Sequence, residues 1–326
     1  MTRKEVKMSP IEKLIRQMIF FARGLVKRMI LHIKYNGEFS RNKKIKHAEI
    51  DFKYTVSIVA VFKNEADYLD EWVRYHQLIG IEHFYLVNNN STDDYKKVLE
   101  KFVDDGTVTL IDLPDKNAQM KAYQLVMERF SQETTWLAII DIDEFIVMVD
   151  KSVKLPEFLN KFGEEVSQII VGWMIFGSSG HIKKLEGGVL DRFRLHSTDD
   201  FIADYKSIVK PSMMLDVPSP HWVNVTGITV DEQGRKYYQY PRHNVKIAKP
   251  ASKKIIRINH YYSKSLEEFQ SKSLRGFADK ERIRRSEADF LEHDQNLEKD
   301  DLVDRYIEIM KHQSFSNEID RNTRIL

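Results

Sequence analysis

From residue 54 to residue 140 the chain alternates strand-like runs with stretches of helical spacing, and this alternation restricts its fold more than any other feature. The strand-like runs are rich in β-branched and aromatic residues, and the runs between them repeat apolar residues every three or four positions. We expect strands at residues 56–62, 83–88, 107–113 and 136–140, and helices at residues 68–78, 95–102 and 119–130. This order predicts an α/β fold with a doubly wound, mostly parallel sheet flanked by helices.

Length and composition narrow the class of protein. The chain has 326 residues, 42% hydrophobic and 31% charged, which is ordinary for a globular protein with one large or two modest domains. It has no cysteine, which excludes disulfides, thiolate zinc sites and a cysteine nucleophile and fits a reducing compartment. Neither the G-x-G-x-x-G pattern nor a P-loop occurs, which argues against a dinucleotide dehydrogenase and a P-loop NTPase.

The basic charge is concentrated at the N-terminal end. Residues 1–50 hold 13 Lys/Arg and 4 Asp/Glu, a net charge of +9, whereas residues 51–326 carry a net charge of −7. Because the net positive charge is confined to this arm and the body is acidic, we expect no nucleic-acid partner.

Within the arm, residues 11–34 have the spacing of an amphipathic helix. Its apolar stripe is Ile11, Ile15, Met18, Ala22, Leu25, Met29 and Ile33, and its basic face is Lys13, Arg16, Arg23, Lys27 and Lys34. The charges are too frequent for a spanning helix. Two interpretations stay open: a helix packed on the body or on a second subunit, or a helix lying in the plane of an anionic membrane, which we favour. Residues 35–50 are polar and basic, and we expect them to form a linker.

Polar clusters follow three of the expected strands, at Lys63-Asn64-Glu65, at residues 88–93 and at Asp141-Ile142-Asp143-Glu144. Ligands bind at the carboxyl ends of the strands in sheets of this kind. If the fourth strand ends at residue 140, the following turn can direct both aspartates onto one ion. Carboxylate oxygens suit Mg²⁺ or Mn²⁺, which can bridge a diphosphate leaving group. The alternative is a pair of solvated acids or a helix cap.

Five blocks in one order resemble glycosyltransferase family 92, a relative of family 2 with the GT-A fold: residues 62–94, 136–145, 171–181, 206–211 and 258–276. The resemblance covers about residues 54–280. It implies an inverting, metal-dependent transfer of a sugar, typically galactose, from a UDP-sugar. With it, we expect an arm and linker at residues 1–50, a GT-A domain at residues 51–278 and a helical extension at residues 279–326.

The resemblance also assigns donor-site residues. Asp141 and Asp143 match the family's DxD motif, which meets metal, ribose and diphosphate, and His260 matches a late histidine that completes the Mn²⁺ (or Mg²⁺) shell. The residues expected near the nucleotide are Asn64, Glu65, Asn88 and Asn90, and those expected near the diphosphate are Lys264, Lys272 and Arg275.

The acceptor half holds further candidates. Ser178, Ser179 and His181 belong to a glycine–serine loop that can approach a sugar closely, although an ordinary glycine turn has the same pattern. Trp173 can stack on an acceptor sugar, and core packing is the more common role for such a residue.

Inversion needs a base that takes the proton of the acceptor hydroxyl. The acids in the acceptor half are Glu144, Glu186, Asp191 and Asp204. We select Asp191, which matches an acidic-Arg-Phe element in relatives, with Glu144 as the second candidate. A salt bridge with an arginine is the structural alternative for Asp191.

Together these observations predict a glycosyltransferase, with UDP-galactose as donor and a glycan or lipid-linked glycan as acceptor, held at the cytoplasmic face of a membrane by residues 11–34. A non-catalytic nucleotide-sugar-binding or polysaccharide-binding protein is the first alternative, and a nucleotide-sugar hydrolase is a weaker one. A homo-oligomer stays open.

Overall fold

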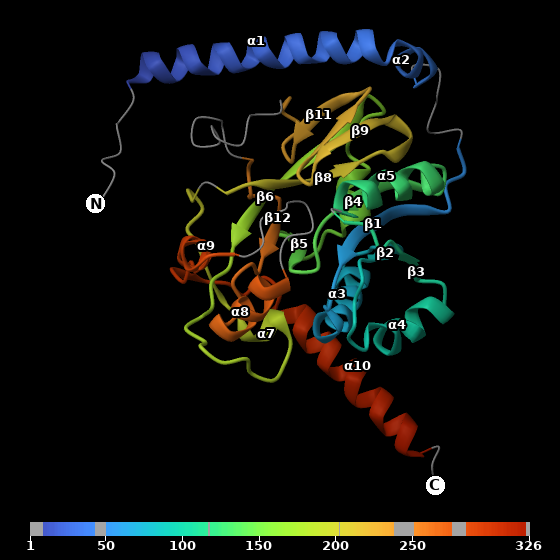
Figure 1. The fold of residues 1–326 in the computed structure, drawn as a ribbon, viewed down its shortest axis with the longest axis vertical. Helices are drawn as coiled ribbons and strands as arrows, with labels where there is room; N and C mark the ends of the chain where they lie inside the picture. Colours follow the sequence, from blue (N-terminus) through green and yellow to red (C-terminus); the bar gives the residue numbers. More distant parts are fainter. Residues whose placement is uncertain are drawn as a thin grey trace.

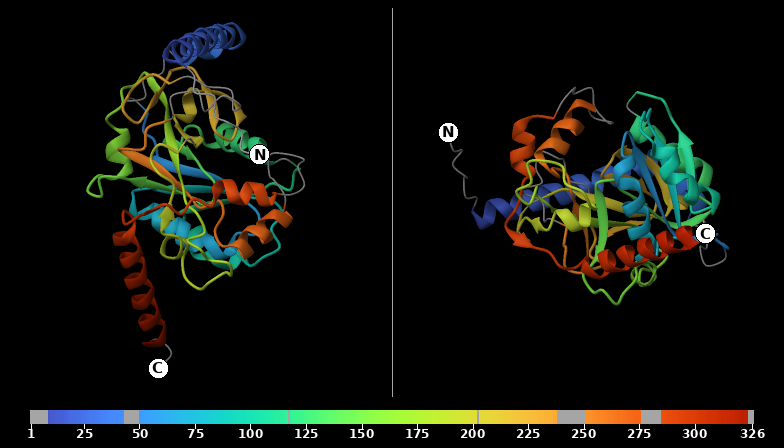
Figure 2. Two further views of the ribbon diagram at one scale, coloured as in Figure 1. Left: turned by 90° about the vertical axis from the view of Figure 1, so that its left-hand side faces the viewer. Right: turned by 90° about the horizontal axis from the view of Figure 1, so that it is seen from below.

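The computed structural model describes residues 9–42, 50–116, 118–201, 203–237, 251–275 and 285–323. These residues form a mixed α/β fold in which helices flank a sheet (Figures 1 and 2). None of the helices in these ranges is both long and apolar enough to cross a membrane.

The first half of the sheet is the one expected from the sequence. Its strands β1 (Tyr54–Phe62), β2 (His83–Asn88), β3 (Val108–Asp112) and β4 (Thr134–Ile139) lie parallel in the order β3-β2-β1-β4. The helices between them are α3 (Ala66–Leu78), α4 (Tyr95–Asp104) and α5 (Ala118–Phe130). All seven elements are confirmed, and their bounds differ from the expected ones by at most two residues.

The second half of the sheet contains two strands, β8 (Tyr205–Val209) and β5 (Glu144–Met148), that run antiparallel to their neighbours. β8 lies antiparallel between β4 and β6 (Val166–Ile175), and β5 lies antiparallel to β12 (Ile256–His260). β12 and β11 (Ile228–Asp231) both run parallel to β6. The carboxyl ends of β1, β4, β6 and β12 therefore share one edge with the amino ends of β5 and β8. The predicted mostly parallel sheet is confirmed, and this shared edge holds the acidic motif.

Successive side chains of a strand point to opposite faces of the sheet, and the core is accordingly divided in two. On one face Val56 and Ile58 of β1 pack with residues of α3, α4 and α10 (Asp304–Thr323). On the other face Val59 packs with residues of α5 and of the hairpin β9 (Met214–Ser219) and β10 (Trp222–Val225).

Several short elements lie around the sheet. They are α6 (Leu155–Leu159), α7 (Val189–Arg192), β7 (Leu195–His196), the 3₁₀ turn η2 (Pro211–Met213), α8 (Leu266–Arg275), α9 (Glu287–His293) and β13 (Glu298–Lys299). The C-terminal extension is not purely helical, because β13 pairs with β7 between α9 and α10.

The amphipathic N-terminal helix is confirmed as α1 (Pro10–Lys34), which begins with a reciprocal capping box between Ser9 and Glu12. α1 crosses one end of the molecule, above β9 and β11 (Figure 1). The expectation of a linker at residues 35–50 is wrong in part, since α2 (Asn36–Asn42) is helical. Residues 43–49 lie outside the described part of the chain.

Candidate active site

The acidic motif lies where β4 ends and β5 begins. The chain turns between Ile139 and Glu144, and the Glu144 amide donates to the Asp141 carbonyl at 3.1 Å. Because β5 pairs antiparallel with β12, Glu144 stands directly opposite His260. Sheet pairing therefore brings the motif and the late histidine together across more than a hundred residues of sequence.

Asp143 is the most strongly paired acid of the motif. It is buried, forms an ion pair with Lys272 of α8, and its Oδ1 lies 3.8 Å from His260 Nε2. Burial alone would raise the pKa of Asp143, but Lys272 and His260 outweigh it and hold the pKa well below its usual value. Burial lowers the pKa of His260 to about 4, so that its imidazole is neutral at pH 7.

Asp141 points to a different set of partners. Its Oδ2 accepts a 2.7 Å bond from Lys206, and its Oδ1 accepts a 2.9 Å bond from Gln119. Lys206 is fully buried in β8 and also lies 3.4 Å from Glu144 Oε2. The turn therefore sends the two aspartates to separate cations, and the expectation that both carboxylates face one ion is not met in this arrangement.

Glu144 is buried behind the motif, where its Oε2 accepts a bond from the Asp141 amide at 3.0 Å. Burial raises the pKa of Glu144 well above its usual value, against the opposing effect of Lys206. Its side chain is completely buried against Lys206 and the Asp141 amide, and this geometry gives Glu144 a supporting position.

A divalent cation fits beside Asp143. No group of three or more His, Asp or Glu side chains able to hold a metal occurs in the described ranges. Asp143 and His260 nevertheless offer one oxygen and one nitrogen ligand side by side, a donor set that suits Mn²⁺. His260 Nδ1 and Glu144 Oε1 are buried and have no hydrogen-bond partner within the residues described. Of these two atoms, Glu144 Oε1 lies 3.9 Å from His260 Nε2, the ring nitrogen that faces Asp143, and is the one that a ligand there or its water would complete.

The residues expected near the nucleotide lie together at the ends of β1 and β2. Asn64 Oδ1 accepts a 2.7 Å bond from the Thr92 amide, which ties the two strand ends together. Asn88 Nδ2 donates to Asp112 Oδ1 at 2.7 Å, and Asn90 Nδ2 donates to the Pro114 carbonyl at 3.1 Å. These bonds brace the loops from within.

Helix α8 closes the site from the opposite side. Lys264, just before it, lies 3.8 Å from Glu65 Oε2 and 3.4 Å from the centre of the Tyr68 ring. Glu268 forms a buried two-bond pair with Arg192, both bonds 3.0 Å long, and Lys272 lies one turn further along. The backbone of Arg275 ends α8, and its side chain is outside the described part.

The glycine–serine loop is held by protein contacts. The Ser178 amide donates to Asp294 Oδ1 at 2.6 Å, and Ser179 Oγ accepts a 2.9 Å bond from the Arg194 amide. At Gly177 a Cβ would lie 2.6 Å from the backbone oxygen of Gln295, so only glycine fits there. His181 Nε2 lies 3.1 Å from the carbonyl oxygen of Arg192. These contacts favour the ordinary-turn interpretation of the pattern.

Backbone strain gathers at the predicted site residues. In the described ranges, the non-glycine residues with positive φ are Asn64 (53°), Asn90 (58°), Ser179 (52°) and Lys264 (50°). This conformation costs about 1 kcal/mol or more per residue and persists only where the surroundings impose it. All four had been selected from the sequence as site residues.

Trp173 packs against His260 and is bonded through its backbone to Asp204. The Trp173 ring lies against His260, with 4.1 Å between ring centres, and its Nε1 is a buried donor without a partner among the described residues. Its amide donates to the Asp204 carbonyl at 3.0 Å. Asp204 precedes β8, two residues before Lys206, and its Oδ2 lies 3.7 Å from His221 Nε2.

Asp191, the base selected from the sequence, is placed differently. Its carboxylate pairs with Lys311 of α10 at 2.8 Å, and its side chain is 48% exposed. Asp191 thus forms a surface ion pair with a lysine, and this contact does not favour a role as base.

The sequence analysis missed Lys206, Gln119 and the Arg192–Glu268 pair. Lys206 lies inside a block that carried the family resemblance and is flanked by the residues of a strand. A lysine within a buried strand almost always has an acidic partner. Its place in a strand-like run could therefore have predicted that Lys206 pairs with an acid.

Comparisons with known proteins agree with the blocks in the sequence. The family model described as "Glycosyltransferase family 92" matches residues 52–293. A glycosyltransferase family 92 protein of Oryza sativa subsp. japonica is 25% identical over 224 residues, 67% of this chain and 35% of that protein. One of Ricinus communis is 28% identical over 239 residues, 69% of this chain and 38% of that protein. The matched region spans little more than a third of these relatives.

Two solved structures show weaker similarity. S. aureus TarS 1–349 is 13% identical, with 49% of this chain and 48% of that chain covered and a TM-score of 0.34. Glucosyl-3-phosphoglycerate synthase from Mycobacterium tuberculosis, in complex with Mn²⁺ and UDP-Glc, is 14% identical, with 42% and 47% covered and a TM-score of 0.28. Both scores lie below 0.5, so the fold is described from the strand order alone.

Proposed function

The chain belongs to glycosyltransferase family 92, and from that premise we propose that the carboxyl edge of its sheet transfers a sugar from a nucleoside diphosphate donor to an acceptor hydroxyl. One observation carries the proposal: the ionised carboxylate of Asp143 lies beside the neutral imidazole of His260 and is paired with Lys272. This is a buried anion with a second metal-binding atom and a paired cation, which suits a metal–diphosphate group.

Asp143 and His260 would hold the divalent cation, Mn²⁺ or Mg²⁺. When bound, the cation supplies positive charge that stabilises the diphosphate as a leaving group. Burial lowers the pKa of Lys272 to about 8, so the side chain is still mostly cationic at pH 7. Lys272 and Lys264 are both placed to offset charge that develops on the diphosphate.

For the base we propose Asp204 in place of Asp191. Its carboxylate precedes β8 at the shared edge, and its side chain is 21% exposed and so open to an acceptor. The acceptor oxygen forms its bond to the anomeric carbon while the bond to the diphosphate breaks. The electron pair leaves with the diphosphate, and the hydroxyl proton goes to Asp204. Attack on the face opposite the leaving group inverts the anomeric centre.

We propose UDP-galactose as the donor, which follows from the family resemblance. We propose a glycan or lipid-linked glycan as the acceptor, which follows from the resemblance together with the basic N-terminal helix. Calorimetric titration of UDP-galactose and UDP-glucose, each with and without Mn²⁺, tests the donor. We expect binding that requires Mn²⁺, favours one sugar and is lost in Asp143→Asn. Asp191→Asn, which removes a surface ion pair, is the matched control and should bind the donor like the unmodified chain.

Two results would contradict this proposal. Equal affinity for the donor with and without Mn²⁺ would contradict the proposed role of the metal. Donor binding without transfer to any acceptor would instead support a non-catalytic nucleotide-sugar-binding protein on the same fold.

A further inference from the structure

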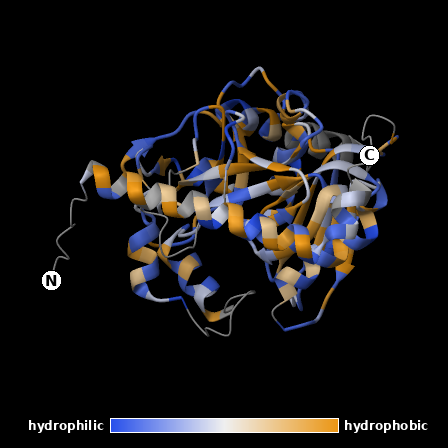
Figure 3. Cartoon of the chain, turned by 90° about the horizontal axis from the view of Figure 1, so that it is seen from above, coloured by the Kyte–Doolittle hydropathy of each residue, from blue (hydrophilic) through white to orange (hydrophobic). Residues whose placement is uncertain are grey.

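Most of the apolar stripe of α1 is not covered by the body, although Leu25 also lines a pocket between the helix and the body. Ten large apolar side chains of this helix are 46% to 76% exposed, among them Ile11, Ile15, Met18, Leu25, Met29 and Ile33. At 100° per residue they span about 160° of the helix circumference along its whole length of about 37 Å. Hydrophobic positions recur along α1 in the view onto it (Figure 3). The sequence left open a helix packed on the body or on a second subunit, and this exposure argues against packing of the stripe on the body while a second subunit stays open.

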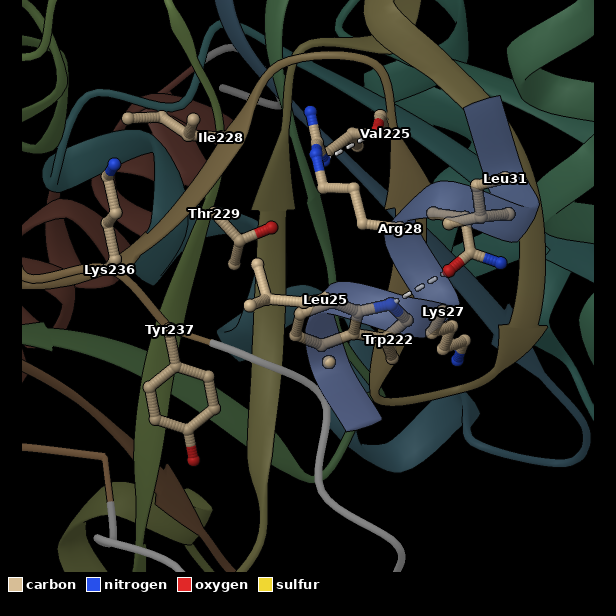
Figure 4. A pocket seen from close by; sticks show the side chains of 12 residues that line it. Leu25, Lys27, Arg28, Leu31, Trp222, Val225, Ile228, Thr229, Lys236 and Tyr237 are labelled. Carbon is tan, nitrogen blue, oxygen red and sulfur yellow. Dashed lines mark hydrogen bonds between the residues drawn. The ribbon is translucent and has the colours of Figure 1, made fainter. Parts of the chain in front are cut away.

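The opposite side of α1 is the side that contacts the body. Arg28 donates to the Thr226 carbonyl at 2.6 Å, and the Tyr35 hydroxyl donates to Asp216 at 2.5 Å. Gly24 and Leu31 line a pocket of about 250 Å³ between α1 and the end of the sheet, where Trp222 and Tyr237 form the other wall (Figure 4). Polar contacts therefore hold the helix in place with its stripe directed outward.

The width of the stripe favours a flat apolar surface as its partner. A coiled-coil seam uses a narrow stripe at two positions of each heptad, whereas this stripe covers almost half of the helix. An in-plane membrane helix has such a wide face, with basic side chains along its edge. Arg23 and Lys27 are exposed and lie between the stripe and the body side.

Charge decides between a membrane and a second copy. The N-terminal 50 residues carry +9 and the remainder −7, so an anionic surface attracts the arm and repels the body. A second copy would bring an equally basic arm against the first, which like charges oppose. The surface of the cytoplasmic leaflet is anionic.

We propose that α1 lies in the plane of an anionic lipid surface, with its apolar stripe among the acyl chains, and that its contacts with Asp216 and Thr226 hold the β9–β11 end of the body toward the membrane. This goes beyond the proposed sugar transfer and does not depend on it.

Flotation of the full chain with vesicles tests the proposal. The vesicles are phosphatidylcholine alone or phosphatidylcholine with about 30% phosphatidylglycerol. We expect binding to the anionic vesicles, and a decrease of about tenfold or more in Met29→Glu/Ile33→Glu, because each carboxylate would have to enter the apolar layer. Leu291→Glu/Leu297→Glu, at two other side chains that are 65% and 66% exposed, is the matched control and should float like the unmodified chain.

Light scattering on the same samples measures the oligomeric state. Donor titration measures, for each variant, whether the carboxyl edge of the sheet still binds the nucleotide-sugar. Unchanged flotation of the α1 variant would overturn the proposal. So would a dimer that the α1 variant splits while neither protein binds vesicles, because a second copy would then cover the stripe. Vesicle binding without donor binding would support this proposal and contradict only the proposed sugar transfer.

Discussion

Lys206 holds the acidic motif in its arrangement. It is fully buried, bonds to Asp141 and lies 3.4 Å from Glu144, and burial of its charge is offset by these acids. Removing one member of a buried ion pair costs about 3–5 kcal/mol, because the other charge is left unpaired. Lys206 therefore links the stability of the fold to the arrangement of the acidic motif, where we propose that the donor binds.

We expect Lys206→Met to lower the free energy of unfolding by about 3 kcal/mol and also to weaken metal-dependent donor binding. Lys210→Met is the control: its ammonium is bonded to the carbonyls of Gly163 and Glu164, away from the motif. It should lose stability but keep donor affinity. Urea unfolding and donor titration measure the two effects, and equal donor affinity in both variants would refute the role of Lys206.

The proposed base makes a kinetic prediction. Asp204→Asn should lower the rate of sugar transfer by about 10²–10⁴ with little change in donor affinity, because the amide cannot take the proton. Asp191→Asn should keep the transfer rate. Initial rates of transfer with saturating donor distinguish Asp204 from Asp191 as the base. Loss of transfer in Asp191→Asn but not in Asp204→Asn would show that Asp191, selected from the sequence, is the base.

At the scale of elements, one ion pair fixes α8 against α7. Burial raises the pKa of Glu268, but its bonds with Arg192, Ser265 and Tyr68 prevail and bring the pKa to about 2. The carboxylate is therefore ionised in the fold at every pH above that value. Because Lys272 follows one turn later on the same helix, this pair also sets where Lys272 meets Asp143.

Glu268→Gln should destabilise the chain by about 3 kcal/mol at pH 7, since Arg192 would be left buried and unpaired. The contribution of Glu268 is complete above pH 4.5 and is lost as the pH falls toward 2, because only the unfolded chain binds a proton in that interval. Glu267→Gln, at a neighbour whose side chain is 45% exposed, should change stability far less, because water screens an exposed ion pair. Urea unfolding curves of both variants at pH 7 and pH 3.5 check these expectations. Equal losses of stability in the two variants would contradict the role of the Glu268–Arg192 pair.

At the scale of the whole molecule, His76 joins helix α3 to strand β5 in the core. It is completely buried, its Nδ1 donates to the Trp72 carbonyl at 2.8 Å, and its Nε2 accepts from the Ile146 amide at 3.3 Å. Only the neutral ring satisfies both bonds. Burial lowers the pKa of His76 to about 3.

Acid should therefore destabilise the entire fold. The unfolded chain takes up a proton at His76 below pH 6.5 and the folded chain does not until about pH 3, so stability falls as the pH falls through this window. We expect a loss of about 3 kcal/mol from His76 between pH 7.5 and pH 4. His76→Gln should be less stable at pH 7.5 but show a smaller loss on acidification. Identical pH dependence in both chains would rule out this cause.

Periodicity along the chain was sufficient for the local part of the structure. The strands and helices from Tyr54 to Ile139, the amphipathic α1 and the position of Asp141 after the fourth strand were all predicted from neighbouring residues. The proximity of His260 to Asp143 came from the family resemblance, and sheet pairing explains it physically. The positions chosen as site residues also include every non-glycine residue of the described chain with positive φ.

Pairings between distant residues could not be predicted in this way. Lys206 lies 65 residues from Asp141, and Lys272 lies 129 residues from Asp143. Which lysine meets which aspartate depends on the insertion of β8 between β4 and β6 and on the place of α8. For the same reason Asp191, whose local sequence matched the family pattern, lies on the surface against Lys311.

The sequence by itself determined the alternating α/β elements, the acidic motif at a strand end and the two faces of α1, because these depend on spacing within one element. Only the tertiary structure decided which cation each acid meets, that Asp204 lies beside Trp173, and that the apolar stripe of α1 faces away from the body. These outcomes depend on which surfaces are brought together and on the cost of burying a charge without a partner. Spacing along the chain carries no information about either.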